Sequence, residues 1–158
     1  MEKILLYTIR LIYPPRCTLC EAILPLTVDK LMCYDCQKDY PFIQEPLCPK
    51  CGKQVITEDT LCDDCKITTH FYEKGIALYP YEGTIKETMY RFKYGGRKKY
   101  AQLFGQMLAK QLQNTNFPSK IDLIVPVPIS KERIRQRGYN QAEEIAKYVS
   151  KYIGIPYN

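Results

Sequence analysis

Four cysteine pairs constrain this chain of 158 residues more than any other feature. Each pair has the form C-x-x-C, and the pairs are separated by twelve, eleven and ten residues. Two residues between thiolates let both sulfurs point at one ion, and two such turns complete a tetrahedral S₄ site that suits Zn²⁺. We therefore predict two structural zinc ions, held by Cys17, Cys20, Cys33, Cys36, Cys48, Cys51, Cys62 and Cys65.

The four motifs can share two ions in two ways. Sequential pairing gives two stacked zinc ribbons, whereas alternate pairing gives an interleaved, RING-like module. We favour sequential pairing, because the two halves look like a duplicated unit with Pro46 just before the second. Four cysteines leave no open coordination position, so we expect a structural role for both ions.

Other uses of the cysteines compete with zinc. Disulfides need an oxidising compartment, and the chain opens without the features of an export signal. A redox pair fits one C-x-x-C motif, but four at near-constant spacing argue against it. Iron in an S₄ site stays open, because thiolate ligands suit both metals.

The charge of the chain changes sign near residue 66. Residues 1–66 hold 8 Lys/Arg and 10 Asp/Glu, whereas residues 67–158 hold 15 and 7. Such a shift indicates a domain boundary. We predict a double zinc ribbon module with a short N-terminal helix over residues 1–69 and a second domain over residues 70–158. No stretch approaches the roughly 18 uncharged apolar residues of a membrane span, so we expect a cytoplasmic protein.

The second part predicts helices and strands in alternation. Apolar residues at helical spacing predict a helix that ends at Gly95 and another over about residues 98–113. Residues 76–81 are β-prone, and residues 121–127 resemble a strand buried on both faces. A last helix begins after the N-cap Asn140 and stops at Gly154. This order predicts an α/β domain in which a βαβ unit begins and is not completed.

A first basic cluster interleaves cations with aromatic residues. The cations are Arg91, Lys93, Arg97 and Lys98, and the rings include Tyr90, Phe92, Tyr94 and Tyr100. Cations that follow phosphates and rings that stack on bases suit single-stranded nucleic acid. The alternative is that the rings belong to the core and the charges form a solvated face.

A second basic cluster lies between the strand and the last helix. Lys131, Arg133, Arg135 and Arg137 occupy what we predict to be a loop. Loops at the carboxyl end of a parallel strand face the binding crevice of α/β folds, and the next helix N-terminus attracts anions. We predict a phosphate site here, with a merely solvated loop as the alternative.

Several segments resemble the ComF family of bacterial competence-associated proteins. They are residues 11–17, the C-x-x-C pairs, residues 81–96, the VPVP sequence at 125–128 and, with Arg133, the RGYNQA sequence at 137–142. The resemblance implies a double zinc ribbon followed by a type I phosphoribosyltransferase-like α/β domain. Its pyrophosphate-contacting loop would correspond to residues 126–137, and Asn140 and Gln141 join Arg133 and Arg137 as expected phosphate or nucleic-acid contacts.

The resemblance also implies a function and a limit. It implies an accessory role in natural transformation, in which single-stranded DNA is handled in the cytoplasm beside a competence helicase. The family's diphosphate-binding signature would lie beyond Asn158, so we expect an incomplete, truncated transferase-like domain. We assign no catalytic residue and expect phosphoribosyl diphosphate binding only in a complete domain. The alternatives are a phosphoribosyltransferase or its inactive remnant, and a zinc ribbon that mediates protein contacts.

Overall fold

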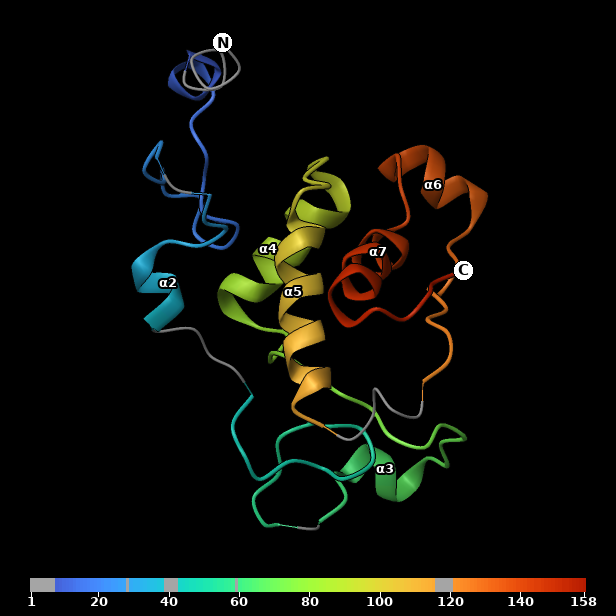
Figure 1. Ribbon diagram of the computed structural model, residues 1–158. Coiled ribbons are helices and arrows are strands. Elements are labelled where there is room, and N and C mark those ends of the chain that lie inside the picture. The colour runs from blue at the N-terminus through green and yellow to red at the C-terminus, as the bar shows by residue number, and fades with distance from the viewer. Residues whose placement is uncertain (1–7, 28, 39–42, 59, 116–120) are drawn as a thin grey trace.

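The structure is a computed structural model of the chain, and it describes residues 8–27, 29–38, 43–58, 60–115 and 121–158. Residues 8–12 are helical and lead into two cysteine-rich ribbons, which contain the short helices α2 (Tyr34–Lys38) and α3 (Asp63–Ile67). The longer helices follow, and Figure 1 shows them grouped at the centre with the second ribbon below. They are α4 (Gly83–Tyr94), α5 (Tyr100–Gln113), α6 (Lys131–Arg137) and α7 (Gln141–Ile153).

Helices α4 and α5 form where the apolar spacing predicts them. Helix α4 ends at the C-cap Gly95, whose N–H donates to the carbonyl of Arg91 at 2.7 Å. Phe92 is fully buried and packs with Tyr100, Ala101 and Phe104 of α5 in one apolar cluster. Phe92 and Tyr100, two of the aromatic residues in the first basic cluster, are therefore core residues.

Helices α5 and α7 pack closely because α5 carries a glycine at their contact. A Cβ at Gly105 would lie 2.4 Å from the Cβ of Tyr148, so any larger residue collides with α7. Helix α7 has the predicted caps: the side chain of Asn140 accepts from Ala142 N, and Gly154 adopts φ 76°. Ile145 and Tyr148 of α7 thereby pack against the apolar cluster around Phe92.

The second basic cluster is a helix, so its prediction as a loop was wrong. The side chain of Ser130 caps α6 by accepting from Arg133 N, and Gly138 ends the helix with φ 80°. Between these two caps, residues 131–137 are good helix formers. The predicted phosphate-binding arginines therefore project from a helix of seven residues.

The predicted strand at residues 121–127 is exposed, so its expected burial on both faces was wrong. Leu123, Val125 and Val127 are 46%, 69% and 72% exposed. One parallel bridge joins Ile124 to Tyr157, which returns beside it after α7. The described residues contain three isolated bridges and no longer ladder, and none of the bridges involves residues 76–81, so the strand predicted there does not form. A segment is buried on both faces only where other strands and helices cover it, and residues 121–127 have no such cover. The transferase-like α/β arrangement therefore stays a prediction.

Within the described parts of the chain, no helix combines the length and apolar character needed to cross a membrane.

Candidate metal centres and the basic face

The eight cysteines gather into two groups of four, in chain order. Within each group the four Sγ atoms lie within 4.8 Å of one another, and all eight thiols are free of disulfides. The first group is Cys17, Cys20, Cys33 and Cys36, and the second is Cys48, Cys51, Cys62 and Cys65. This confirms sequential pairing over the interleaved alternative.

The sulfur spacing fits a tetrahedral zinc ion. Bonds of about 2.3 Å to a central ion set sulfur–sulfur edges of about 3.8 Å. The Sγ atoms of Cys20 and Cys33 are 3.7 Å apart, and those of Cys51 and Cys62 are 3.6 Å apart. Both cysteine groups are therefore compatible with one structural zinc ion each.

The two ribbons use the same local backbone. In the first, the N–H of Cys17 donates to Ala22 O at 2.8 Å, and in the second the N–H of Cys48 donates to Lys53 O at 2.7 Å. One antiparallel bridge closes each turn, Arg16 to Ile23 and Leu47 to Gln54. The predicted duplicated unit is thus visible in the geometry.

One buried cysteine in each ribbon ionises readily. Burial opposes the thiolate of Cys17, but N–H donors of Cys20, Cys33 and Leu19 outweigh it and lower the pKa of Cys17 to about 7. The same balance of burial against backbone N–H groups lowers the pKa of Cys48 to about 6. Because the thiolate is the metal ligand, each ribbon presents one ligand that loses its proton more easily than an ordinary cysteine, Cys48 more so than Cys17.

Glu21 marks the difference between the two ribbons. The residue after the second cysteine of each first knuckle has a positive φ, 75° at Gly52 and 61° at Glu21. Glycine adopts this conformation freely, whereas a residue with a Cβ is strained in it. Glu21 is held there by contacts from α5 and from the turn before it: Tyr100 Oη donates to its carboxylate at 3.2 Å, and Arg97 lies at 3.5 Å.

Arg91 completes the join between the first ribbon and the helices. Its Nη2 donates to Leu19 O at 2.5 Å, and its Nε lies 3.9 Å from the Glu21 carboxylate. Thr88 Oγ1, fully buried on α4, also donates to Leu19 O. Beside these polar contacts the ribbon and the helices share one apolar cluster of Cys17, Leu19, Leu24, Met32, Ile85 and Leu103. The first zinc centre is therefore built into the helical core.

The second ribbon is attached differently. The backbone N–H of Gly75 donates to Lys50 O at 2.6 Å, and a Cβ on Gly75 would lie 3.0 Å from Cys51 Cα. Gly52 is equally close to the segment that contains Gly75, since a Cβ on Gly52 would lie 3.0 Å from Ala77 N. Residues 75–77, which we call the strap, thus pass directly over the Cys48–Cys51 knuckle on their way to α4.

The predicted phosphate contacts separate into two groups. Three of them pair with acids: Arg91 and Arg97 with Glu21, and Lys98 with the buried Glu144 at 3.1 Å. Burial opposes ionisation of Glu144, but hydrogen bonds from Lys147 and Lys98 outweigh it and lower its pKa. These three cations are occupied by structural ion pairs.

Of the other predicted contacts, Lys93 and Arg137 lie against exposed tyrosine rings. Lys93 Nζ lies 5.6 Å from the ring centre of Tyr81, and the Arg137 guanidinium lies 5.0 Å from that of Tyr94. Tyr90 and Tyr94 are themselves 5.0 Å apart. We call Tyr81, Tyr90 and Tyr94 the tyrosine stripe. Beside it Arg133 is exposed, Asn140 caps α7, and the buried Gln141 accepts from Arg137 Nη1 at 3.1 Å.

Sequence reasoning missed two residues of these sites. It gave Glu21 no role, although its position after a C-x-x-C knuckle, where the second ribbon has Gly52, is an available signal. It also treated Tyr81 as part of a strand, whereas its ring is 61% exposed and stacks with Lys93.

Paired cysteine substitutions test the ligand sets. Zinc analysis should find about two ions per intact chain. Cys20→Ser with Cys33→Ser removes ligands of one centre, so about one ion should remain; Cys20→Ser with Cys51→Ser damages both centres, so neither ion should be retained. An interleaved module predicts the reverse, with no ion in the first double variant and one in the second.

Comparison with known proteins agrees with these centres. A family model described as a double zinc ribbon domain matches residues 8–66. The chain is 29% identical to competence protein ComFC of Bacillus subtilis over 133 residues, 80% of this chain and 55% of that protein. It is 25% identical to competence protein F of Haemophilus influenzae over 144 residues, 89% and 62% of the two chains.

A third relative is the DNA utilization protein YhgH of Escherichia coli, 22% identical over 110 residues, 68% of this chain and 48% of that protein. The chain spans about half the length of the curated relatives it matches. No solved structure matches it. With two ribbon sites in chain order and an alignment to ComFC and competence protein F along most of its length, the chain is similar to the proteins of the ComF family.

Proposed function

We propose that the chain is an accessory protein of DNA uptake that binds single-stranded DNA on the tyrosine stripe, in the cytoplasm and beside a competence helicase. The names of the relatives support a role connected with DNA: two are competence proteins, and the third is a DNA utilization protein. The single observation that carries the strand-binding proposal is the pairing of exposed tyrosine rings with cations across α4 and α6.

The stripe has the composition that a single strand requires. Tyr81, Tyr90 and Tyr94 are 61%, 65% and 47% exposed, so their faces are accessible to bases. A hollow of ≈ 620 Å³ lies between Tyr81 and Tyr90, with Lys86 on its wall. Base–aromatic stacking tolerates any sequence, and neighbouring cations attract the phosphates. This combination favours binding of a single strand with little base preference.

The zinc ribbons act in this proposal as a scaffold for the stripe. Arg91, at the edge of the hollow, and Arg97, just after α4, are held by Glu21 of the first ribbon, which joins α4 to that ribbon. Binding of DNA is thus assigned to Lys86, Lys93, Arg133 and Arg137, and not to Arg91, Arg97 or Lys98, which have acidic partners.

Substitutions on the stripe test the proposal. Binding of a labelled oligo(dT) should fall about tenfold for Tyr90→Ala and for Tyr94→Ala, because each loses a stacked base. Lys93→Met should reduce the slope of log affinity against log salt by about 0.7, the share of one phosphate contact on a single strand. Fluorescence anisotropy at several salt concentrations measures both effects.

Tyr13→Ala is the matched control, since Tyr13 is 78% exposed and lies just before the first ribbon, outside the tyrosine stripe. It should leave oligo(dT) binding unchanged. Affinity that does not vary with salt, or that falls equally in the Tyr13 and Tyr90 variants, would contradict the assignment of DNA to the stripe.

A second candidate function is binding of a diphosphate such as phosphoribosyl diphosphate at the start of α7. Arg137 Nε and Gln141 Nε2 are buried there without a hydrogen-bond partner among the described residues. Two such donors at a helix N-terminus favour an anion. Nothing in the described residues nominates a nucleophile or general base beside them, so binding, and not transfer, is the proposed activity.

Calorimetry tests this second candidate. Phosphoribosyl diphosphate should release heat on binding to the zinc-loaded chain, and Gln141→Leu should weaken that binding about tenfold, because it removes a buried donor. Asn114→Leu, which changes an amide at the end of α5, serves as the control. Absence of heat at millimolar ligand would exclude the anion site.

A further inference from the structure

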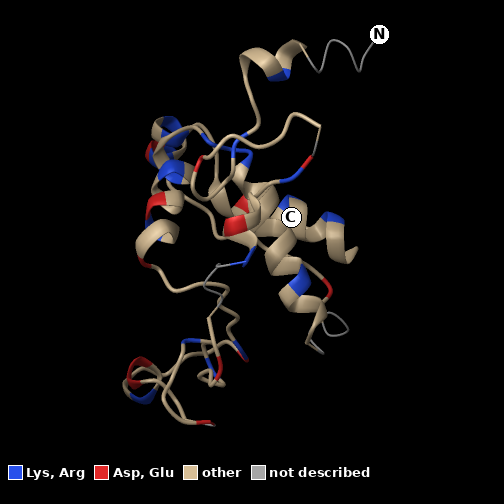
Figure 2. Cartoon of the chain, turned by 90° about the vertical axis from the view of Figure 1, so that its left-hand side faces the viewer, with Lys and Arg blue, Asp and Glu red and all other residues tan. Residues whose placement is uncertain are grey.

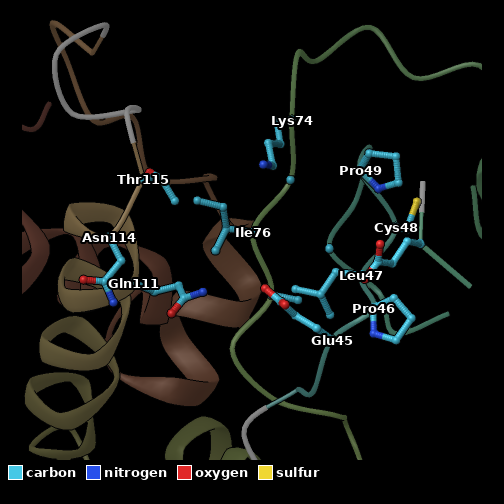
Figure 3. Close-up of a pocket in the computed structure, with 14 residues that line it drawn as sticks. Glu45, Pro46, Leu47, Cys48, Pro49, Lys74, Ile76, Gln111, Asn114 and Thr115 are labelled. Carbon is cyan, nitrogen blue, oxygen red and sulfur yellow. The ribbon is translucent and has the colours of Figure 1, made fainter. Parts of the chain in front are cut away.

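A cavity separates the second ribbon from the end of α5. Its volume is ≈ 580 Å³. It is lined by residues of the ribbon, by Lys74 and the strap, and by residues at the end of α5. Figure 3 shows Gln111 and Asn114 entering from α5 on one side, Glu45 and Leu47 from the ribbon on the other, and Lys74 at the edge. This volume is in the usual range for ligand sites, roughly 300–1,000 Å³.

Four of the polar side chains around the cavity are uncommitted, and three of them, Glu45, Glu58 and Asn114, are exposed. Among the described residues, the carboxylates of Glu45 and Glu58 and the amides of Gln111 and Asn114 form no hydrogen bond or ion pair. The acids of α3 on the same ribbon differ: Asp64 pairs with Lys53 at 2.9 Å, and Asp63 pairs with Lys66 at 3.1 Å. The cavity therefore concentrates the unpaired acceptors of this ribbon.

The charged side chains that line the cavity are mostly acidic. Two carboxylates line it, together with Cys48, a ligand of the second metal centre, where four thiolates and one Zn²⁺ carry a net charge of about −2. The carboxyl end of α5, which stops at Gln113, adds the negative end of a helix dipole. Lys74 is the single cation among the lining residues. Phosphates are therefore repelled, and a cation is attracted.

We propose that this cavity binds an arginine-bearing segment of a partner protein. A guanidinium group donates to two carboxylates at once and to amide oxygens, which are the acceptors that Glu45, Glu58, Gln111 and Asn114 offer. The aliphatic part of an arginine side chain packs on apolar surface, which Leu47 and Ile76 provide. The volume exceeds that of one side chain, so the neighbouring residues of the segment also enter.

The position of the cavity gives binding a structural effect. The segment would contact the second ribbon on one side and α5 on the other. Without it, the ribbon contacts the strap at residues 75–77, where Gly75 N donates to Lys50 O. Figure 2 shows this ribbon projecting below the helices, with acidic and basic residues along it. The bound segment would tie the second zinc centre to the helical body.

A blocked, fluorescein-labelled tetra-arginine peptide tests the proposal on the zinc-loaded full chain. It should bind more tightly than a tetra-glutamine peptide in fluorescence anisotropy at physiological salt. Glu45→Gln with Glu58→Gln should weaken binding at least about tenfold, because the guanidinium loses both charged acceptors. Lys74→Met should strengthen binding about threefold, because a like charge is removed. Zinc content should be unchanged in all variants.

Asp63→Asn with Asp64→Asn is the matched control, since it removes the same charge from the same ribbon outside the cavity. It should change affinity by less than about twofold. Equal losses in the two double variants would show attraction by general charge alone and overturn the proposal. Binding of spermidine without binding of the peptide would also overturn it, in favour of a polyamine site.

The result is independent of the proposed DNA function. Tetra-arginine should bind the Tyr90→Ala variant as it binds the unsubstituted chain, because Tyr90 does not line this cavity. Loss of peptide binding in that variant would place the peptide on the tyrosine stripe and contradict the assignment to the cavity.

Discussion

The clustering of four thiols in the first ribbon, in an arrangement compatible with one structural zinc ion, is the constraint on which the rest of the structure depends. A ribbon of this size has few apolar side chains with which to form a core of its own, so metal binding and folding are linked. Here the ordered ribbon supplies Leu19, Leu24 and Met32 to the apolar cluster that also contains Ile85 of α4 and Leu103 of α5. Loss of the ion would therefore remove packing partners from helices far along the chain.

The second ribbon repeats the fold of the first with a different relation to the helices. Gly52 occupies the strained position without cost, whereas Glu21 occupies the matching position and accepts from Tyr100 of α5. Strain at a residue persists when surrounding contacts over-determine it, and Glu21 has such contacts. The first ribbon is a part of the core, and the second is a projecting module whose unpaired acids face a cavity. The two similar ribbons are thus attached to the helices in different ways.

Patterns whose physics is local could be predicted from the sequence. The C-x-x-C spacing gave the metal ligands, and Asn140, Gly95 and Gly154 gave the helix ends, because a ligand turn or a cap depends on a few neighbouring residues. Features that depend on distant partners could not be predicted. The roles of Arg91 and Arg97 depend on Glu21, which lies some seventy residues earlier in the chain. The exposure of Val125 depends on which other elements cover the segment that contains it.

Hydrogen exchange in two matched variants tests the central claim, that the first zinc centre is part of the helical core and the second is not. Cys20→Ser with Cys36→Ser disables the first centre, and Cys51→Ser with Cys65→Ser disables the second. The claim predicts that amides of α4 and α5 lose protection at least about a hundredfold in the first variant and change less than about threefold in the second. Equal protection of α4 and α5 in the two variants would contradict it.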